Sequence, residues 1–157
     1  MEINYDDIAI TEAISIQEEI RKKIVLQPFT KSIKVIAGVD ISFNKYSTTV
    51  YAGIILLRFP DFKPIAHSLA KAEVTFPYVP GFLAFREIPA IVKAWNLLPS
   101  FPDILILDGQ GTAHPRRAGI ASQFGVLTDQ VTIGSAKKLL FGKYEEPGNS
   151  KYDSNPI

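Results

Sequence analysis

The sequence contains no cysteine among its 157 residues, and this absence excludes two classes of protein. A scaffold held by disulfides needs paired cysteines, and a thiolate metal centre needs cysteine ligands. The absence of cysteine also fits a reducing compartment.

Strong charge and long apolar runs are absent as well. The formal net charge is +1, so any basic surface that meets nucleic acid must be local. No apolar run is long enough to cross a bilayer, and the acidic N-terminal residues lack the basic and apolar regions of a signal peptide. We therefore expect a cytoplasmic protein without membrane contact, and the sequence identifies no protein partner.

The composition that remains is that of a packed domain. Hydrophobic residues make up 46% of the chain and charged residues 21%, which excludes wholesale disorder. The length predicts one domain over residues 1–157. Within it, residues 142–157 are polar and rich in Pro, Gly, Asn and Ser, and we expect a loop or disordered segment there.

The order of the predicted elements indicates an α/β fold with a mixed sheet. Short connections between the first three strands predict antiparallel neighbours, and the later alternation of helix and strand predicts a parallel half. Ile16, Ile20 and Ile24 recur every four residues and predict the apolar face of the first helix. Pro89 predicts a kink or a late start in the second. The predicted elements are a helix over Thr11–Ile24, strands over Ile33–Phe43, Thr49–Phe59 and Ile65–Phe76, a helix over Phe82–Leu97, a strand over Ile104–Leu107, a helix over Ala118–Leu127 and a strand over Val131–Ile133.

The segment Leu105–Arg117 is the most informative part of the chain. An apolar run ends at Asp108, and Gly109 and Gly111 follow before His114 and two arginines. A carboxylate held at a strand end, facing a glycine turn beside basic side chains, suits a site that handles metal and phosphate. The alternative is an ordinary polar turn, because Asp and Gly are common turn formers.

Two further carboxylates have unusual positions. Asp40 lies within an otherwise apolar strand, where an isolated charge is costly unless it is paired or binds a cation. Glu87 lies in the first turns of a predicted helix. Together with Asp108 these residues could form a Mg²⁺ site. The alternative is a solvated sheet face for Asp40 and a solvated helix surface for Glu87.

An aromatic side chain lies between two prolines in the block Phe76–Glu87. Pro77 and Pro80 stiffen a short loop with Tyr78 at its tip, and Gly81 permits the turn into the helix. A stiff loop of this kind can wedge an apolar side chain between bases. The alternative is that Tyr78 is a packing residue.

Four segments in this order resemble the endonuclease V family, and the resemblance extends from about residue 11 to about residue 157. The segments are Gly38–Phe43, Pro77–Glu87, Asp108–Gly111 with His114–Arg117, and Thr132–Lys138.

The resemblance implies a ribonuclease H-like fold and a metal-dependent endonuclease of DNA repair. Such an enzyme nicks a strand at the second phosphodiester 3′ to inosine, which is deaminated adenine. It leaves a 3′-hydroxyl and a 5′-phosphate. The implied cofactor is Mg²⁺, with Mn²⁺ as its substitute. The implied partner is inosine-containing DNA, with RNA as the alternative substrate.

The resemblance also implies roles for individual residues. The metal ligands would be Asp40, Glu87 and Asp108, with His114 and Lys137 assisting at the scissile phosphate. Tyr78 would be the wedge. The residues that bind the substrate with Tyr78, several of them lining a lesion pocket, would be Pro80, Gly81, Leu83, Gly109 and Ile120.

The sequence departs from the family in two places. Gln123 stands where the family usually has histidine. The chain also lacks the C-terminal strands and helix that follow in family members, so we expect a C-terminally truncated fold with an exposed sheet edge or apolar patch. This departure keeps open the alternative of a catalytically impaired or silent relative that binds inosine-containing nucleic acid. A third alternative, a different ribonuclease H-like nuclease without lesion specificity, is disfavoured by the wedge loop Pro77–Pro80.

Overall fold

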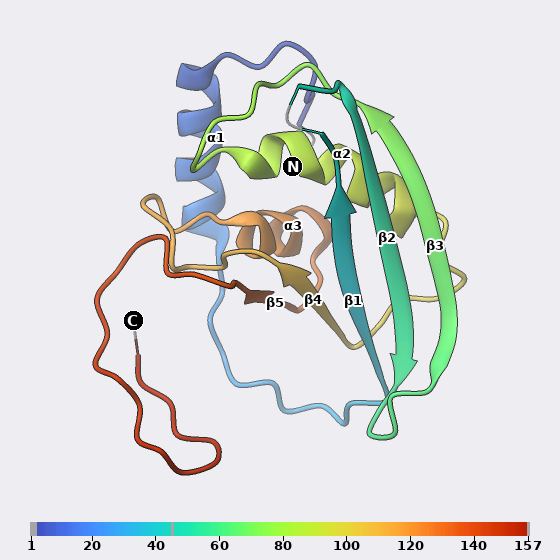
Figure 1. Cartoon of the computed structure of the whole chain (residues 1–157), viewed down its shortest axis with the longest axis vertical. Helices are drawn as coiled ribbons and strands as arrows, with labels where there is room; N and C mark the ends of the chain where they lie inside the picture. Colours follow the sequence, from blue (N-terminus) through green and yellow to red (C-terminus); the bar gives the residue numbers. More distant parts are fainter. Residues whose placement is uncertain (1–2, 45, 157) are drawn as a thin grey trace.

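The computed structural model describes residues 3–44 and 46–156. One sheet in the order β3-β2-β1-β4-β5 forms the body of the molecule, and its helices lie beside it (Figure 1). The helices are α1 (Ile10–Lys23), α2 (Leu83–Trp95) and α3 (Ile120–Thr128), and the strands are β1 (Val35–Ser42), β2 (Thr49–Arg58), β3 (Pro64–Glu73), β4 (Ile104–Asp108) and β5 (Thr132–Ser135).

The sheet has the two halves that the sequence predicts. β1, β2 and β3 form an antiparallel meander, whereas β4 runs parallel to both β1 and β5. The mixed α/β fold is therefore confirmed, and the element ends differ from prediction by a few residues at most. Lys45, in the predicted loop between β1 and β2, lies outside the described residues, as do residues 1–2 and 157.

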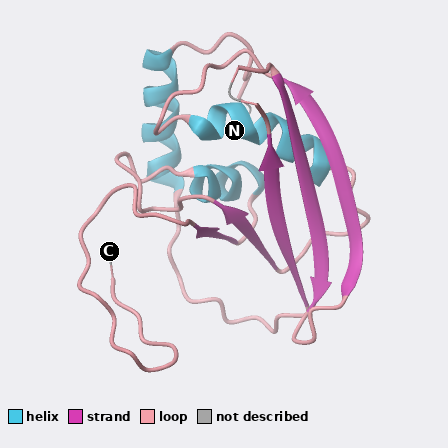
Figure 2. Ribbon diagram, viewed as in Figure 1, coloured by secondary structure: helices cyan, strands magenta, loops and turns pink. Residues whose placement is uncertain are grey.

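Helices α2 and α3 cover the same face of the sheet (Figure 2). Alternate residues of β2, such as Val50, Ile54 and Leu56, point into the core that these helices close. Helix α2 continues through Pro89, so the late start predicted from this proline does not occur. The core side of α2 is apolar enough to hold the helix despite one missing backbone hydrogen bond.

Helix α1 packs outside this layer, and its buried face differs from prediction. The structure buries Ala13, Gln17 and Ile20, while Ile16 and Ile24 are only half-buried. The buried stripe is thus rotated from the Ile16–Ile20–Ile24 face. A polar side chain, Gln17, is fully enclosed on it.

The opposite sheet face has no helix against it in the described part of the chain. Exposed apolar side chains on this face include Leu69, at 72%, and Tyr51 and Ile55, which share it by the alternation of β2. These side chains form an apolar patch on the uncovered sheet face.

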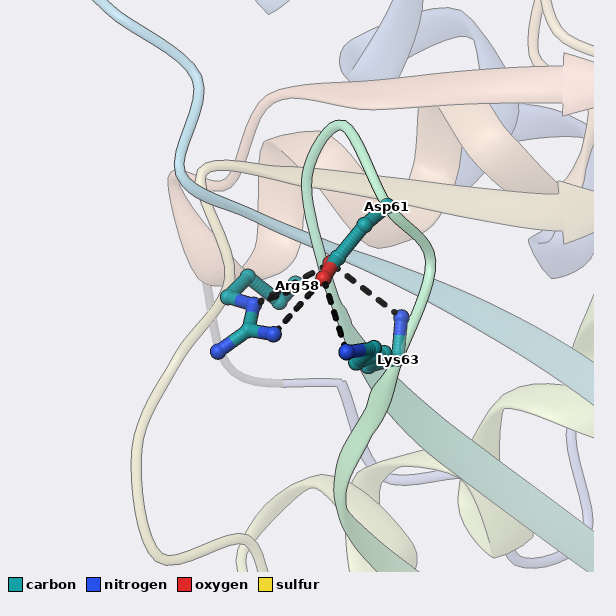
Figure 3. Close-up of polar contacts among 3 residues, drawn as sticks. All are labelled: Arg58, Asp61 and Lys63. Atoms are coloured by element: carbon teal, nitrogen blue, oxygen red, sulfur yellow. Dashed lines mark hydrogen bonds and ion pairs between the residues drawn. The ribbon is translucent and has the colours of Figure 1, made fainter.

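The side chain of Asp61 holds the hairpin between β2 and β3 through polar contacts, as Figure 3 shows. Asp61 accepts a hydrogen bond from Nη2 of Arg58 at 2.6 Å, and its other oxygen accepts one from the backbone N–H of Lys63 at 3.4 Å. Hydrogen bonding to Arg58 lowers the pKa of Asp61. This ion pair is exposed, so it fixes the turn more than it stabilises the fold.

The segment after β5 leaves the body of the molecule as an extended loop (Figure 1). Between residues 142 and 156 the structure has turns and bends but no helix or strand. Nowhere in residues 3–44 and 46–156 is there a helix long and apolar enough to cross a membrane.

Candidate active site

Asp40 and Asp108 lie on neighbouring parallel strands. The last aligned pair between β1 and β4 is Val39 with Leu107, and each aspartate is the next residue on its strand. Because side chains alternate along a strand, both aspartates point to the face opposite the core residues Val39 and Leu107. The predicted ligands on these two strands therefore share one face, and both are exposed.

Lys137 joins this pair from the segment after β5. Its Nζ lies 3.0 Å from Oδ2 of Asp108, and this hydrogen bond raises the pKa of the lysine. The negative charge of Asp40 raises it further, so the ammonium group lies within the field of both carboxylates. An exposed pair of this kind contributes little to stability.

Glu87 contributes the third carboxylate from α2. It is half-buried, and burial is the main cause that raises its pKa, to about 7. The charge of Asp108 adds to this effect, which shows that the two carboxylates repel each other. The charge of Asp108 thus acts on Glu87, while the charges of Asp108 and Asp40 both act on Lys137.

The carboxylates do not form a closed ligand cluster. In the described residues, no group of three or more Asp, Glu or His side chains is close enough to hold a metal ion. That Asp40, Glu87 and Asp108 share one or two cations therefore stays a prediction. The Lys137 ammonium lies against Asp108 and offsets its charge. The oxygen donors and the raised pKa of Glu87 nevertheless fit a hard divalent cation.

Tyr78 lies at the tip of its proline loop, as predicted, and is 42% exposed. Its ring packs against Phe43, with 6.2 Å between the ring centroids. Arg86 supports the base of the loop, because its Nη1 donates to the carbonyl of Phe76 at 2.8 Å and its guanidinium lies over Phe43. Pro80 is exposed beside the tyrosine.

His114 is enclosed between two loops. It is 3% exposed, and its Nδ1 accepts a hydrogen bond from the backbone N–H of Arg116 at 3.2 Å. Its Nε2 lies 2.9 Å from the carbonyl of Gly81, so the proton resides on Nε2. Burial lowers the pKa of the ring. With both nitrogens bonded to backbone, His114 joins two loops in this structure and is not free to contact a phosphate.

The residues predicted for the lesion pocket lie at the starts of α2 and α3 and at the end of β4. Leu83 begins α2, and Ile120 begins α3. Gly109 has a φ of 152°, and a Cβ placed on it would lie 2.6 Å from Cγ2 of Ile120. The absent side chain therefore lets the strand end and the helix start touch directly.

Sequence reasoning missed three polar side chains that organise these loops. They are Gln17, Arg86 and Arg116. For Gln17 the signal was a glutamine between the apolar positions Ala13 and Ile20 of a helix. For Arg86 it was a basic residue next to Glu87 on an otherwise apolar helix.

Gln123, the other departure from the family pattern, is fully buried in α3. Its Nε2 donates to the carbonyl of Ala118 at 3.0 Å. The side chain thus closes the turn that precedes its own helix.

The sheet order, with acids on the adjacent strands β1 and β4, defines a ribonuclease H-like fold. Solved structures agree. Endonuclease V from Streptomyces avermitilis superposes with a TM-score of 0.88 and 39% identity, and the match covers 94% of this chain and 66% of that one. Endonuclease V from Ciona intestinalis, in complex with DNA containing an inosine followed by a ribo-adenosine, gives a TM-score of 0.77 and 35% identity, with 83% and 59% covered.

Sequence comparison gives the family itself. The endonuclease V family model matches residues 18–157. Endonuclease V of Trichormus variabilis is 46% identical over 151 residues, which cover 96% of this chain and 68% of the relative. The chain belongs to the endonuclease V family, as the four segments indicated, and it spans about two thirds of the length of these relatives.

Proposed function

We propose that this chain is a divalent-metal-dependent endonuclease that nicks nucleic acid strands beside inosine as a step of DNA repair. The observation that carries this proposal is that Asp40 and Asp108 lie on one face of adjacent strands, with Lys137 hydrogen-bonded to Asp108. Family membership supports the reaction class. Mg²⁺ is the proposed cofactor and Mn²⁺ its substitute.

In the proposed site Asp40, Glu87 and Asp108 hold the metal. When bound, the cation activates water and stabilises the leaving oxygen of a phosphodiester. Water adds to phosphorus and the bond to the 3′-oxygen breaks, leaving a 3′-hydroxyl and a 5′-phosphate. The Lys137 ammonium, already beside Asp108, neutralises charge that develops on the phosphate.

Tyr78 is the proposed wedge. Its exposed ring, supported by Phe43, fills the space of a displaced base. The flipped inosine then lies against the backbone of Gly81 and Gly109, with Leu83 and Ile120 as apolar walls and Pro80 bordering the wedge. Inosine-containing DNA is the proposed substrate, since the Ciona intestinalis relative binds such a strand.

The test is incubation of the chain with an end-labelled DNA strand containing one inosine and Mg²⁺. A single nick at the second phosphodiester 3′ to the inosine is expected, and chelation of the metal should abolish it. The matched controls are a strand without inosine and the Asp108→Asn variant. Asp108→Asn should lower the rate by several powers of ten and leave strand binding largely intact. Nicking of an RNA strand of the same sequence tests the alternative preference for RNA.

A second candidate is a relative that binds inosine-containing strands without cutting them. It is favoured by the absence, in the described residues, of three carboxylates within ligating distance of one cation. Inosine-dependent binding without any nick at saturating Mg²⁺ or Mn²⁺ would support this candidate over the nuclease.

A further inference from the structure

The carbonyl oxygen of Gly81 is held by three side chains from distant parts of the chain. It lies 3.0 Å from Nε2 of Gln17, 2.9 Å from Nε2 of His114 and 3.1 Å from Nη2 of Arg116. A carbonyl oxygen has two lone pairs, so three donors saturate it. The direction of this carbonyl is therefore fixed more firmly than that of an ordinary loop residue.

Gln17 is the link between this carbonyl and α1. Its side chain is fully buried, and both ends of its amide are used. The nitrogen donates to Gly81, and the oxygen accepts from Nε of Arg116. The Arg116 guanidinium also lies over the ring of Phe82, 4.2 Å from its centroid. A buried amide with both groups bonded orients its partners strictly, because every alternative arrangement leaves a polar group unsatisfied.

Gly81 ends the loop that presents Tyr78. Its φ of 81° lies in the left-handed region, and the next backbone N–H, of Phe82, donates to the carbonyl of Val79 at 3.0 Å. The turn from Tyr78 into α2 therefore passes through the residue whose carbonyl Gln17 holds.

We propose that Gln17 is a positioning residue for lesion recognition: by fixing the Gly81 carbonyl and Arg116, it sets the height at which Tyr78 projects. This inference rests on the proposed function, because it takes Tyr78 as the wedge. Gln17 does not reach the substrate in this scheme and acts only through the loop.

The first test compares Gln17→Met with wild type. Methionine has nearly the same shape but cannot donate to Gly81. Affinity for inosine-containing and undamaged strands is measured at fixed salt without divalent cation. The preference for inosine should fall about tenfold, with affinity for the undamaged strand unchanged. Ile20→Ala, from the same buried stripe of α1, is the control and should keep the preference. An equal loss in Ile20→Ala would overturn the proposal.

The second test asks whether Gln17 acts through Tyr78. In a Tyr78→Ala background, Gln17→Met should cause a much smaller loss of preference than in the wild type, because the wedge is gone and only the hold of Gln17 on the Gly81 carbonyl remains. Losses that multiply would mean that Gln17 acts on another part of the molecule, and would reject the proposal.

Hydrogen exchange in the free protein separates failure of this inference from failure of the proposed function. Residues 76–82 should exchange faster in Gln17→Met than in Ile20→Ala, whether or not the chain prefers inosine. Unchanged exchange there would refute positioning by Gln17. A wild-type chain without inosine preference would instead refute the proposed function. If Gln17→Met does not fold, Gln17→Glu replaces it, since it keeps the acceptor for Arg116 and loses the donor to Gly81.

Discussion

The half-buried carboxyl of Glu87 links the chemistry of the candidate site to the stability of the fold. Its pKa rises from an ordinary 4.5 to about 7, through burial and the nearby charge of Asp108. Between these two pH values the folded chain binds more protons at Glu87 than the unfolded chain does. Proton linkage therefore means that the contribution of Glu87 to the free energy of unfolding falls as pH rises from about 4.5 to 7.

Glu87→Gln should therefore stabilise the fold near neutral pH. The variant removes the buried charge, and we expect a gain of roughly 1–3 kcal/mol above pH 7 that disappears below about pH 4.5. Denaturant unfolding from pH 4 to 8 without divalent cation measures the effect. If the free energies of unfolding of Glu87→Gln and the wild type differed by the same amount across this range, Glu87 would titrate normally in the folded state.

Tyr78→Ala should weaken binding to an inosine-containing strand by roughly one to two powers of ten. Stacking of a base on an aromatic ring is worth about 1–3 kcal/mol, and this variant removes it. The fold should be little affected, because the ring is 42% exposed. Affinities for inosine-containing and undamaged strands at the same salt concentration decide the matter. An equal loss on both would make Tyr78 a packing residue.

At the scale of elements, the connection from β4 to α3 is held by backbone hydrogen bonds at both of its ends. The N–H of Gly109 donates to the carbonyl of Ser135 at 3.0 Å, and the N–H of Ala121 donates to the carbonyl of Gln110 at 3.1 Å. These bonds tie the strand end to β5 and to the helix start. Asp108 is thus held at the end of β4, because Gly109, the residue that follows it, is bonded to β5.

Gly109→Ala should disturb this connection. The new methyl group meets Cγ2 of Ile120 at 2.6 Å, and the backbone φ disfavours any side chain. We expect a loss of about 1–3 kcal/mol in stability, as for other overpacked sites. The double variant Gly109→Ala/Ile120→Ala should lose less stability than the sum of the losses in the two single variants, because Ile120→Ala opens space for the new methyl group. If denaturant unfolding showed that the two losses of stability are strictly additive, the cost of Gly109→Ala would lie in the backbone alone.

Most elements could be predicted from the sequence because their patterns are local. The apolar runs around Val39 and Leu107 and the short connections between strands predict the sheet, and the structure confirms it. The buried face of α1 could not be predicted in this way. Ile16–Ile20–Ile24 is the more apolar stripe, but the partners of α1 offer a carbonyl and a guanidinium, which select Gln17 instead.

The sequence predicts which residues belong to the candidate site better than it predicts how their side chains are placed. Asp40 and Asp108 lie together because strand pairing follows from hydrophobic pattern. The family resemblance implies that His114 assists at the scissile phosphate. Its burial depends on a loop contact with Gly81, 33 residues away, which no local pattern encodes.

At the scale of the whole molecule, ligand binding and folding are coupled. A cation that binds the folded chain and not the unfolded chain stabilises the fold in proportion to the logarithm of its concentration above the dissociation constant. The repulsion between Glu87 and Asp108 is a cost of folding that such a cation would offset. Metal binding is therefore measurable as thermal stability, without any substrate.

Mg²⁺ at about ten times its dissociation constant should raise the melting temperature of this domain by about 3–5 °C at neutral pH and constant ionic strength. Asp40→Asn and Asp108→Asn should each remove most of this increase, because each takes away one anionic ligand. The matched control is Asp61→Asn, an acid in the hairpin at Arg58, which should keep the full increase. The measurement is a thermal melt with and without Mg²⁺ for all four proteins. If Asp108→Asn kept the full increase while Asp61→Asn lost it, the cation would bind at the hairpin, and the proposed metal site would be wrong.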